Sequence, residues 1–242
     1  MRLAPLVLLF ISAAARAQTV AVDVGHYNAE PGAISSRGRP ELEFNRDLAR
    51  EIGAAVRKSG LRTTVIGADG AMARLTGRTA AAAGADLFLS VHHDSVQPYL
   101  LDAWEFDGDL RLFNDSHSGF SLFVSRKNPF LDASLACASA IGAALRGAGF
   151  KPSLYHADPI PGENKPFADR ENGVHYYDNL IVLKTARSPA VLLEAGVIVN
   201  REEELKMRSP ETQRAIAAAV AAGVERCLPR GKLRTVATAG AR

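Results

Sequence analysis

Val20–His26, with the sequence VAVDVGH, is an apolar run that ends in a glycine and a histidine. Continuous apolar runs of this kind are typical of strands buried on both faces of a parallel sheet. In open α/β sheets, ligands bind at the carboxyl ends of such strands. We therefore expect the first strand of a buried sheet here, with His26 delivered to a binding edge.

Two later segments repeat this arrangement. Leu87–Val91 runs into His92, and Ala190–Leu193 runs into Glu194. A single histidine after a strand is more often structural than functional. Three apolar strands that each end in a metal-binding type of residue instead predict a common site at one edge of the sheet.

Helical patterns alternate with these strands along the chain. Apolar periodicity, alanine content and terminal glycines predict helices at 41–58, 71–83, 132–146 and 211–228. Further strands are expected at 61–66, 120–124 and 180–183. This alternation predicts one α/β domain over residues 18–228, with a twisted, mostly parallel sheet and helices on both faces.

The first 17 residues have the pattern of a secretory signal peptide. Arg2 supplies a positive start, residues 3–14 are apolar, and Ala15-Arg16-Ala17 fits a cleavage site. The apolar stretch is shorter than the roughly 20 residues of a membrane-spanning helix. We expect cleavage after Ala17, export to the periplasm or cell envelope, and a formal net charge that falls from +3 to +1 as two arginines leave.

The nearly neutral mature chain favours no nucleic-acid partner. Its remaining basic excess lies in residues 229–242, which hold four basic residues and no acid, and we expect a flexible tail there. Cys137 and Cys227 are the only cysteines. Export permits a disulfide between them, but two small buried side chains fit the sequence as well, so the pairing stays open.

Two long connections follow strand ends and are candidates for contact with a ligand. Gln97–Ser118 has no clear period but is rich in apolar side chains. We expect it to lie over or beside the site and to limit access to it, although a segment that packs elsewhere on the domain fits the sequence as well. Lys151–Asn179 carries several histidines and tyrosines, which fits either a wall of the site or a surface loop held by aromatic packing.

The residue types at the three strand ends suit zinc. A catalytic zinc ion takes His nitrogen and carboxylate oxygen and keeps one position for water. His26 and His92 offer two nitrogens, and the opening turn of the helix at 41–58 offers Glu41 and Glu43 as the carboxylate. Because these carboxylates lie two residues apart on a helix, they cannot face the same way. Acidic residues at a helix N-terminus are also favoured by the helix dipole alone, without any metal.

Four ordered motifs resemble one known family. They are DVGH at 23–26, Glu43 with Leu48 five positions on, LFLSVH at 87–92 and PAVLLEAG at 189–196. Together they resemble the zinc-dependent N-acetylmuramoyl-L-alanine amidases of bacterial cell walls, over nearly all of the chain from Thr19 to about Leu228.

The resemblance implies a role for each motif. The zinc ligands would be His26, Glu43 and His92, and Glu194 would be the catalytic acid and base. The substrate would be peptidoglycan, cut at the amide between N-acetylmuramic acid and L-alanine. Such an enzyme needs a carboxylate beside the metal because an amide nitrogen leaves poorly without a proton.

Some alternatives stay open at this point. Phe44 stands where the family usually has a basic residue after the liganding glutamate, which keeps Glu41 as an alternative ligand. A zinc peptidase or deacetylase acting on another envelope amide, or an inactive wall-binding module of the same fold, would share most of these residues. The sequence does not say whether an activator protein is needed, which stem peptides are preferred, or what the oligomeric state is.

Overall fold

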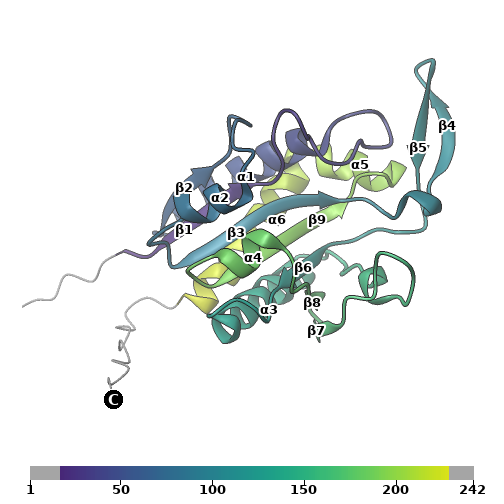
Figure 1. Ribbon diagram of the computed structural model, residues 1–242. Helices are drawn as coiled ribbons and strands as arrows, with labels where there is room; N and C mark the ends of the chain where they lie inside the picture. The colour runs from purple at the N-terminus through teal and green to yellow at the C-terminus, as the bar shows by residue number, and fades with distance from the viewer. Residues whose placement is uncertain (1–16, 229–242) are drawn as a thin grey trace, which may run out of the picture.

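A seven-stranded sheet forms the centre of the computed structural model, which describes residues 17–228 (Figure 1). The strand order is β2-β1-β3-β9-β6-β8-β7. β1, β2, β3 and β9 run parallel, β6 is antiparallel to β9, and β7 is antiparallel to β8. The bounds are β1 Thr19–Val24, β2 Arg62–Ile66, β3 Leu87–Asp94, β6 Ser121–Val124, β7 Phe167–Asp169, β8 Val174–Tyr176 and β9 Ala190–Val197.

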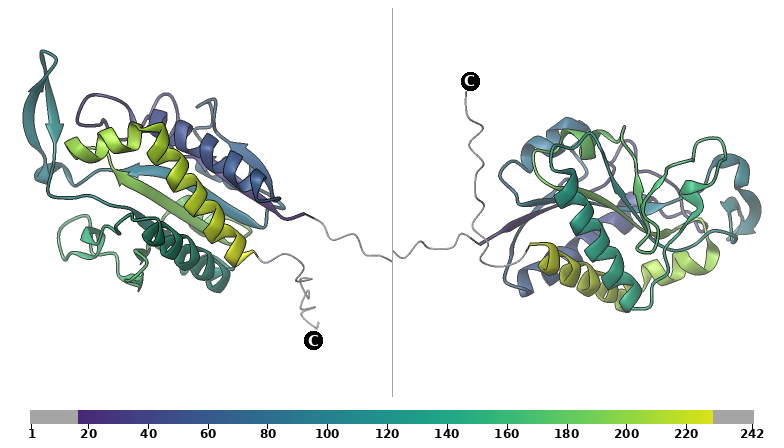
Figure 2. Two further views of the ribbon diagram at one scale, coloured as in Figure 1. Left: turned by 180° about the vertical axis from the view of Figure 1, so that it is seen from behind. Right: turned by 90° about the horizontal axis from the view of Figure 1, so that it is seen from below.

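Helices cover both faces of this sheet, which confirms the predicted architecture (Figure 2). Three long helices pack side by side on one face, and two short ones lie on the other. The long helices are α1 Glu41–Lys58, α3 Leu131–Gly147 and α6 Pro210–Cys227, and the short ones are α2 Leu75–Ala81 and α4 Ile181–Thr185. A further helix, α5 Arg201–Arg208, follows β9, and 3-10 turns lie at Pro98–Leu100 and Tyr155–Ala157.

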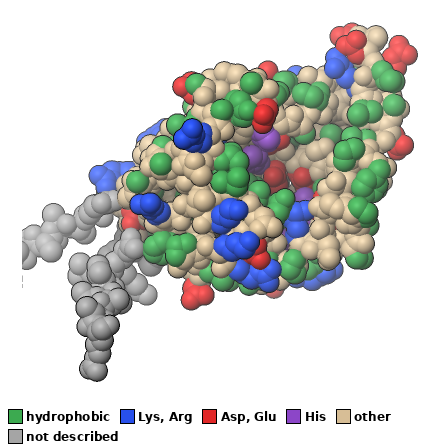
Figure 3. Space-filling model, in the orientation of Figure 1, with side chains coloured by type: hydrophobic (Ala, Val, Ile, Leu, Met, Phe, Trp, Pro, Cys, Tyr) green, Lys and Arg blue, Asp and Glu red, His purple; other side chains and the backbone are tan. Residues whose placement is uncertain are grey.

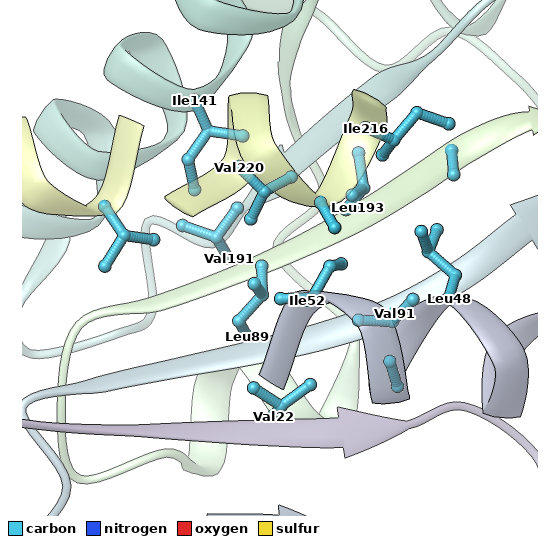
Figure 4. Close-up of a cluster of buried hydrophobic side chains, with 14 of the residues drawn as sticks. Val22, Leu48, Ile52, Leu89, Val91, Ile141, Val191, Leu193, Ile216 and Val220 are labelled. Atoms are coloured by element: carbon cyan, nitrogen blue, oxygen red, sulfur yellow. The ribbon is translucent and has the colours of Figure 1, made fainter. Parts of the chain in front are cut away.

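The main core lies between the sheet and the three long helices. Leu89 and Val91 of β3 meet Ile52 of α1, while Leu193 of β9 meets Val220 of α6 (Figure 4). Alternate residues of the same strands, such as Phe88, form a second core under α2 and α4. Because successive strand residues point to opposite faces, each of these strands is buried on both sides.

Several segments differ from the sequence-based expectation. The predicted loop at 151–179 contains β7 and β8 of the main sheet, and no helix is predicted where α5 lies. The run at 180–183, predicted as a strand, is the start of α4, since a four-residue apolar run does not distinguish a strand from a short buried helix. The aperiodic segment 97–118 holds an antiparallel hairpin made of β4 Asp102–Phe106 and β5 Asp109–Phe113, which projects from the carboxyl-terminal end of the sheet (Figure 1).

Cys137 of α3 and Cys227 at the end of α6 form a disulfide, which answers the pairing that the sequence left open. The predicted signal peptide up to Arg16 and the basic tail from 229 onward lie outside the described residues. Among residues 17–228, no helix has the length and apolar character needed to cross a bilayer.

Candidate metal centre and active site

The parallel register of three strands brings the predicted residues to one edge. Val24 pairs with Val91, so β1 ends just before Gly25 and His26 at the level where β3 reaches His92. On the other side of β3, His92 pairs with Glu194 of β9. Paired residues in neighbouring strands share a face of the sheet. Figure 3 shows histidine and carboxylate side chains inside a hollow on this face.

His26, Glu41 and His92 form a cluster in which one candidate ligand atom from each residue lies within 4.8 Å of the others. The Glu41 carboxylate bridges the two imidazoles, with Oε2 at 2.9 Å from Nε2 of His26 and Oε1 at 3.0 Å from Nδ1 of His92. Two imidazole nitrogens and one carboxylate oxygen are the donor set of many catalytic zinc sites. The residues present therefore fit a zinc ion.

The structure places Glu41 in this cluster and leaves the predicted ligand Glu43 outside it. The Glu43 side chain is 50% exposed and its Oε2 accepts a hydrogen bond from Arg39 Nε at 2.9 Å, whereas the Glu41 side chain is 5% exposed. At 3.6 residues per turn, side chains two positions apart point in directions about 200° apart. One of the two glutamates must face the sheet and the other must face solvent.

A sequence signal for Glu41 does exist in the helix itself. Asn45 lies four positions after Glu41, on the same helical face as Leu48 and Ile52, and its Nδ2 donates to Glu41 Oε1 at 3.0 Å. The apolar stripe of the helix thus continues through Asn45 to Glu41. Glu43 instead falls in line with Asp47 on the polar face.

The backbone around Glu41 holds its carboxylate in place. The amides of Ala33 and His93 both donate to it, each at 3.2 Å. Burial raises the pKa of Glu41, but hydrogen bonds with His26 and His92 more than offset this and hold the pKa well below its usual range. The carboxylate is therefore ionised, as a metal ligand must be.

Two glycines make room for the cluster. A Cβ on Gly25 would lie 2.3 Å from the His92 ring, and a Cβ on Gly32 would lie 2.3 Å from Glu41 Oε2. Gly32 also has φ +81°, a left-handed conformation that other residues rarely adopt. The imidazole of His92 therefore rests directly on the backbone that follows β1.

His93 does not belong to the cluster, although it follows His92 directly. It points to the opposite face of the sheet, where its Nδ1 lies 2.8 Å from Asn45 Oδ1 and its ring contacts Phe44. Burial lowers the pKa of His93 to about 3, so the ring is neutral. It is a structural histidine that supports Asn45, and through Asn45 it supports Glu41.

Glu194 lies beside the cluster, and its carboxyl group is unusual in its hydrogen bonding and its pKa. Its Oε2 is buried and has no hydrogen-bond partner among the described residues. Burial raises its pKa well above the usual range, and the negative charges of Asp94 and Glu41 add to this effect. A buried carboxyl with a free oxygen and a raised pKa is what acid–base catalysis requires.

The loop at 151–179 is joined to the end of β3 by a buried histidine. His156 Nε2 lies 2.8 Å from Asp94 Oδ2, and His156 Nδ1 lies 2.8 Å from Glu163 Oε2. Lys165 Nζ donates to the same Glu163 oxygen at 2.5 Å. Both ring nitrogens therefore face carboxylates, which favours the imidazolium form. This ion-pair network fixes the loop next to the hollow.

The His156 network predicts a pH-dependent stability. Burial alone lowers the pKa of His156, but Asp94 and Glu163 raise it overall to about 9. A histidine whose pKa is raised on folding stabilises the protein fully below its unfolded pKa of about 6.5, and this contribution disappears as the pH rises through 9. We expect the difference in unfolding free energy between wild type and His156→Gln to shrink by about 2 kcal/mol from pH 7 to pH 10.

Denaturant unfolding at several pH values measures this difference. His175→Gln is the matched control, because burial lowers the pKa of His175 to about 4 and the ring stays neutral over the whole range. The control difference should stay constant from pH 7 to pH 10. An equally constant difference for His156→Gln would show that the imidazolium bridge does not form.

The hairpin of β4 and β5 stands at the side of the hollow. Trp104 Nε1 donates to the carbonyl of Ser36 at 2.9 Å, and the Arg201 guanidinium lies 3.8 Å from the centre of the Phe113 ring. Its base thus packs on the loop before Glu41 and on the start of α5. Figure 3 shows the histidines in the hollow uncovered from this side, so the hairpin lies beside them, and its effect on access stays a prediction.

Comparisons with known proteins agree with this geometry. The sequence model of the family described as N-acetylmuramoyl-L-alanine amidase matches residues 20–226. No curated protein matches the chain significantly. An N-acetylmuramoyl-L-alanine amidase from Clostridium difficile 630 has a similar structure, with 20% identity, coverage of 88% of this chain and 97% of that one, and a TM-score of 0.68.

Two further solved structures share the fold. The amidase Ami1 from Mycobacterium smegmatis is 22% identical and covers 87% of this chain and 96% of its own, with a TM-score of 0.68. The CwlD amidase from Clostridioides difficile, solved in complex with the GerS lipoprotein, is 17% identical and covers 87% and 98%, with a TM-score of 0.64. At these identities the likeness establishes the fold.

Proposed function

The chain belongs to the N-acetylmuramoyl-L-alanine amidase family, and from this premise we propose that it is an exported, zinc-dependent enzyme that cuts the amide between N-acetylmuramic acid and L-alanine in peptidoglycan. The observation that carries the proposal is the cluster of His26, Glu41 and His92 with the unpartnered Oε2 atom of Glu194 beside it. This arrangement supplies both a metal site and a proton carrier at one sheet edge.

His26, Glu41 and His92 would hold the zinc ion, with Glu41 in the place that the family resemblance gave to Glu43. When bound, zinc polarises an amide carbonyl and lowers the pKa of water to near neutrality. The chain contributes a fixed geometry, because Glu41 is held by two backbone amides and by Asn45. Because these side chains are already ordered, little conformational entropy is lost when the metal binds.

Glu194 would move the proton. Its buried carboxyl takes a proton from the attacking water and gives it to the amine that leaves, so it acts first as a base and then as an acid. The raised pKa of Glu194 favours the second step, since it strengthens the hold of the carboxyl on the proton it has accepted until the amine takes that proton. The nearby charge of Asp94 is one cause of that raised pKa.

Export is supported by the amino-terminal pattern and by the disulfide. Residues 1–17 have the features of a signal peptide, and Cys137–Cys227 is of a kind that persists in oxidising compartments such as the periplasm. Both agree with a substrate that lies outside the cytoplasmic membrane. We place the mature catalytic domain at residues 18–228.

Digestion of purified peptidoglycan tests the proposal. Mass spectrometry should show stem peptides with a free L-alanine amine and glycan strands with intact N-acetylmuramic acid, and a chelator should abolish both products. Cleavage within the stem peptide would identify a peptidase, and loss of acetyl groups would identify a deacetylase. Peptidoglycan that is bound but unchanged, with zinc present, would indicate an inactive wall-binding module.

The same digestion tests whether a second protein activates the enzyme. One structural neighbour was solved in complex with a lipoprotein, and we propose that a partner protein activates this chain. Low turnover by the purified chain that rises when envelope extract is added would support this proposal. Full turnover by the chain alone would show that it needs no activator.

A further inference from the structure

Arg78 is a buried arginine that the proposed chemistry does not use. It belongs to α2, on the face of the sheet that carries the hollow, and its side chain is 1% exposed. Isolated buried charges are costly, so an arginine in this position needs several partners. Its partners all lie where the chain leaves β1 or in the segment just before α2.

The guanidinium makes four hydrogen bonds through its two terminal nitrogens. Nη1 donates to Asp23 Oδ1 at 2.8 Å and to the carbonyl of Val24. Nη2 donates to the carbonyl of His26 and, at 2.8 Å, to the carbonyl of Met72. Asp23 balances the positive charge and also accepts from Ser90 Oγ at 2.8 Å. One planar group thus holds the backbone on both sides of Gly25.

The backbone that Arg78 holds has an unfavourable conformation. His26 has φ +68°, in the left-handed region that residues with a Cβ rarely adopt. Such conformations persist only where surrounding contacts determine them, and they cluster at functional sites. This turn directs the His26 ring toward Glu41, where Nε2 and Oε2 are 2.9 Å apart.

The residue that follows β2 also leaves space for the arginine. Gly67 has φ +72°, and a Cβ there would lie 2.8 Å from Arg78 Nη1 and 3.4 Å from the carbonyl oxygen of Val24. The fork of donors on a guanidinium reaches two carbonyls at once, which the single ammonium of a lysine does not match. The site is therefore built for arginine.

We propose that Arg78 is a positioning residue for the metal centre, which holds His26 in its left-handed conformation by binding the carbonyls of Val24 and His26. The inference rests on the metal site of the proposed function. It assigns Arg78 no contact with substrate or metal. Its effect is to set the direction of one ligand, and groups that orient ligands in this way typically change metal affinity by 10–100-fold when they are removed.

Zinc affinity of the purified protein, measured by competition with a chromogenic chelator, tests the proposal. We expect Arg78→Met to bind zinc about 10–100-fold more weakly than wild type, and Arg78→Lys to fall between the two. Asn128→Ala is the control, because the Asn128 side chain is also buried and donates to the carbonyls of Leu183, Ala186 and Ser188 away from the cluster. It should lower stability and leave zinc affinity unchanged.

A double variant separates position from stability. In Asp23→Leu/Arg78→Met both charges are replaced by apolar side chains, which often restores stability. The carbonyls of Val24 and His26 still lack the hydrogen bonds that Arg78 donates. We expect it to fold and still to bind zinc weakly, with a changed φ at His26 in a metal-free crystal structure. Wild-type zinc affinity and an unchanged φ in this variant would overturn the inference. A wild-type protein that binds no zinc would instead overturn the proposed function, and the φ at His26 would still decide the role of Arg78.

Discussion

Replacing Glu194 by Gln should lower the rate of amide cleavage by about 10²–10⁴-fold, the range that a general acid–base group supplies. The amide side chain keeps the shape of the carboxyl but neither accepts nor donates the required proton. Glu194 is not a member of the metal-binding cluster, so zinc affinity should stay close to that of wild type. Initial rates on peptidoglycan fragments, together with the zinc content of the purified variant, measure the two effects.

The matched control is Glu202→Gln, which makes the same chemical change at an exposed position of α5. Its rate and zinc content should equal those of wild type. Near-normal turnover in Glu194→Gln would remove the residue from catalysis. If that variant lost zinc as well as activity, Glu194 would have to be counted among the ligands.

Glu41→Gln and Glu43→Gln should differ strongly, although they lie two residues apart. We expect the first to weaken zinc binding by at least about 100-fold, since it removes a ligand and not merely a group that orients one. It also leaves His26 and His92 without their shared carboxylate. The second removes an exposed ion pair with Arg39, which is worth at most about 1 kcal/mol, and should leave zinc affinity unchanged.

Zinc titration of both variants, with thermal unfolding to confirm folding, decides between the two glutamates. Each variant serves as the control for the other because the substitution is identical. The reverse result, with zinc lost in Glu43→Gln and kept in Glu41→Gln, would restore the ligand that the family motif suggested. It would also show that the start of α1 rotates when the metal binds.

The sequence predicts most of the sheet because its strands are long, apolar and followed by polar residues. β1, β3 and β9 have this form, and their parallel order places His26, His92 and Glu194 at one edge without further information. The run at 180–183 is too short to show this pattern, since four apolar residues fit either a strand or the five-residue helix α4. The hairpin is not predicted because its two five-residue strands are short and pair only with each other, outside the main sheet.

To choose between Glu41 and Glu43, one must know which face of α1 is turned toward the sheet. Residue types at the start of α1 suit either glutamate, and the family spacing favours Glu43, which lies in the structure on the exposed side of the helix beside Arg39. The buried face of α1 indicates which glutamate faces the sheet. Ile52 and Leu48 lie on this face, and Asn45 continues it toward Glu41. A polar residue on a buried face was a sign that the stripe continues into the site.

The position of β3 between β1 and β9 limits how this chain can vary in length. His92 and His93 point to opposite faces, so inserting or deleting one residue within β3 would exchange them and also turn Phe88 and Leu89 to the wrong cores. We therefore expect changes in length to be tolerated after Asp94, where β3 ends, and not within the strand. The hairpin begins just beyond that point, at a position where added residues leave both histidines undisturbed.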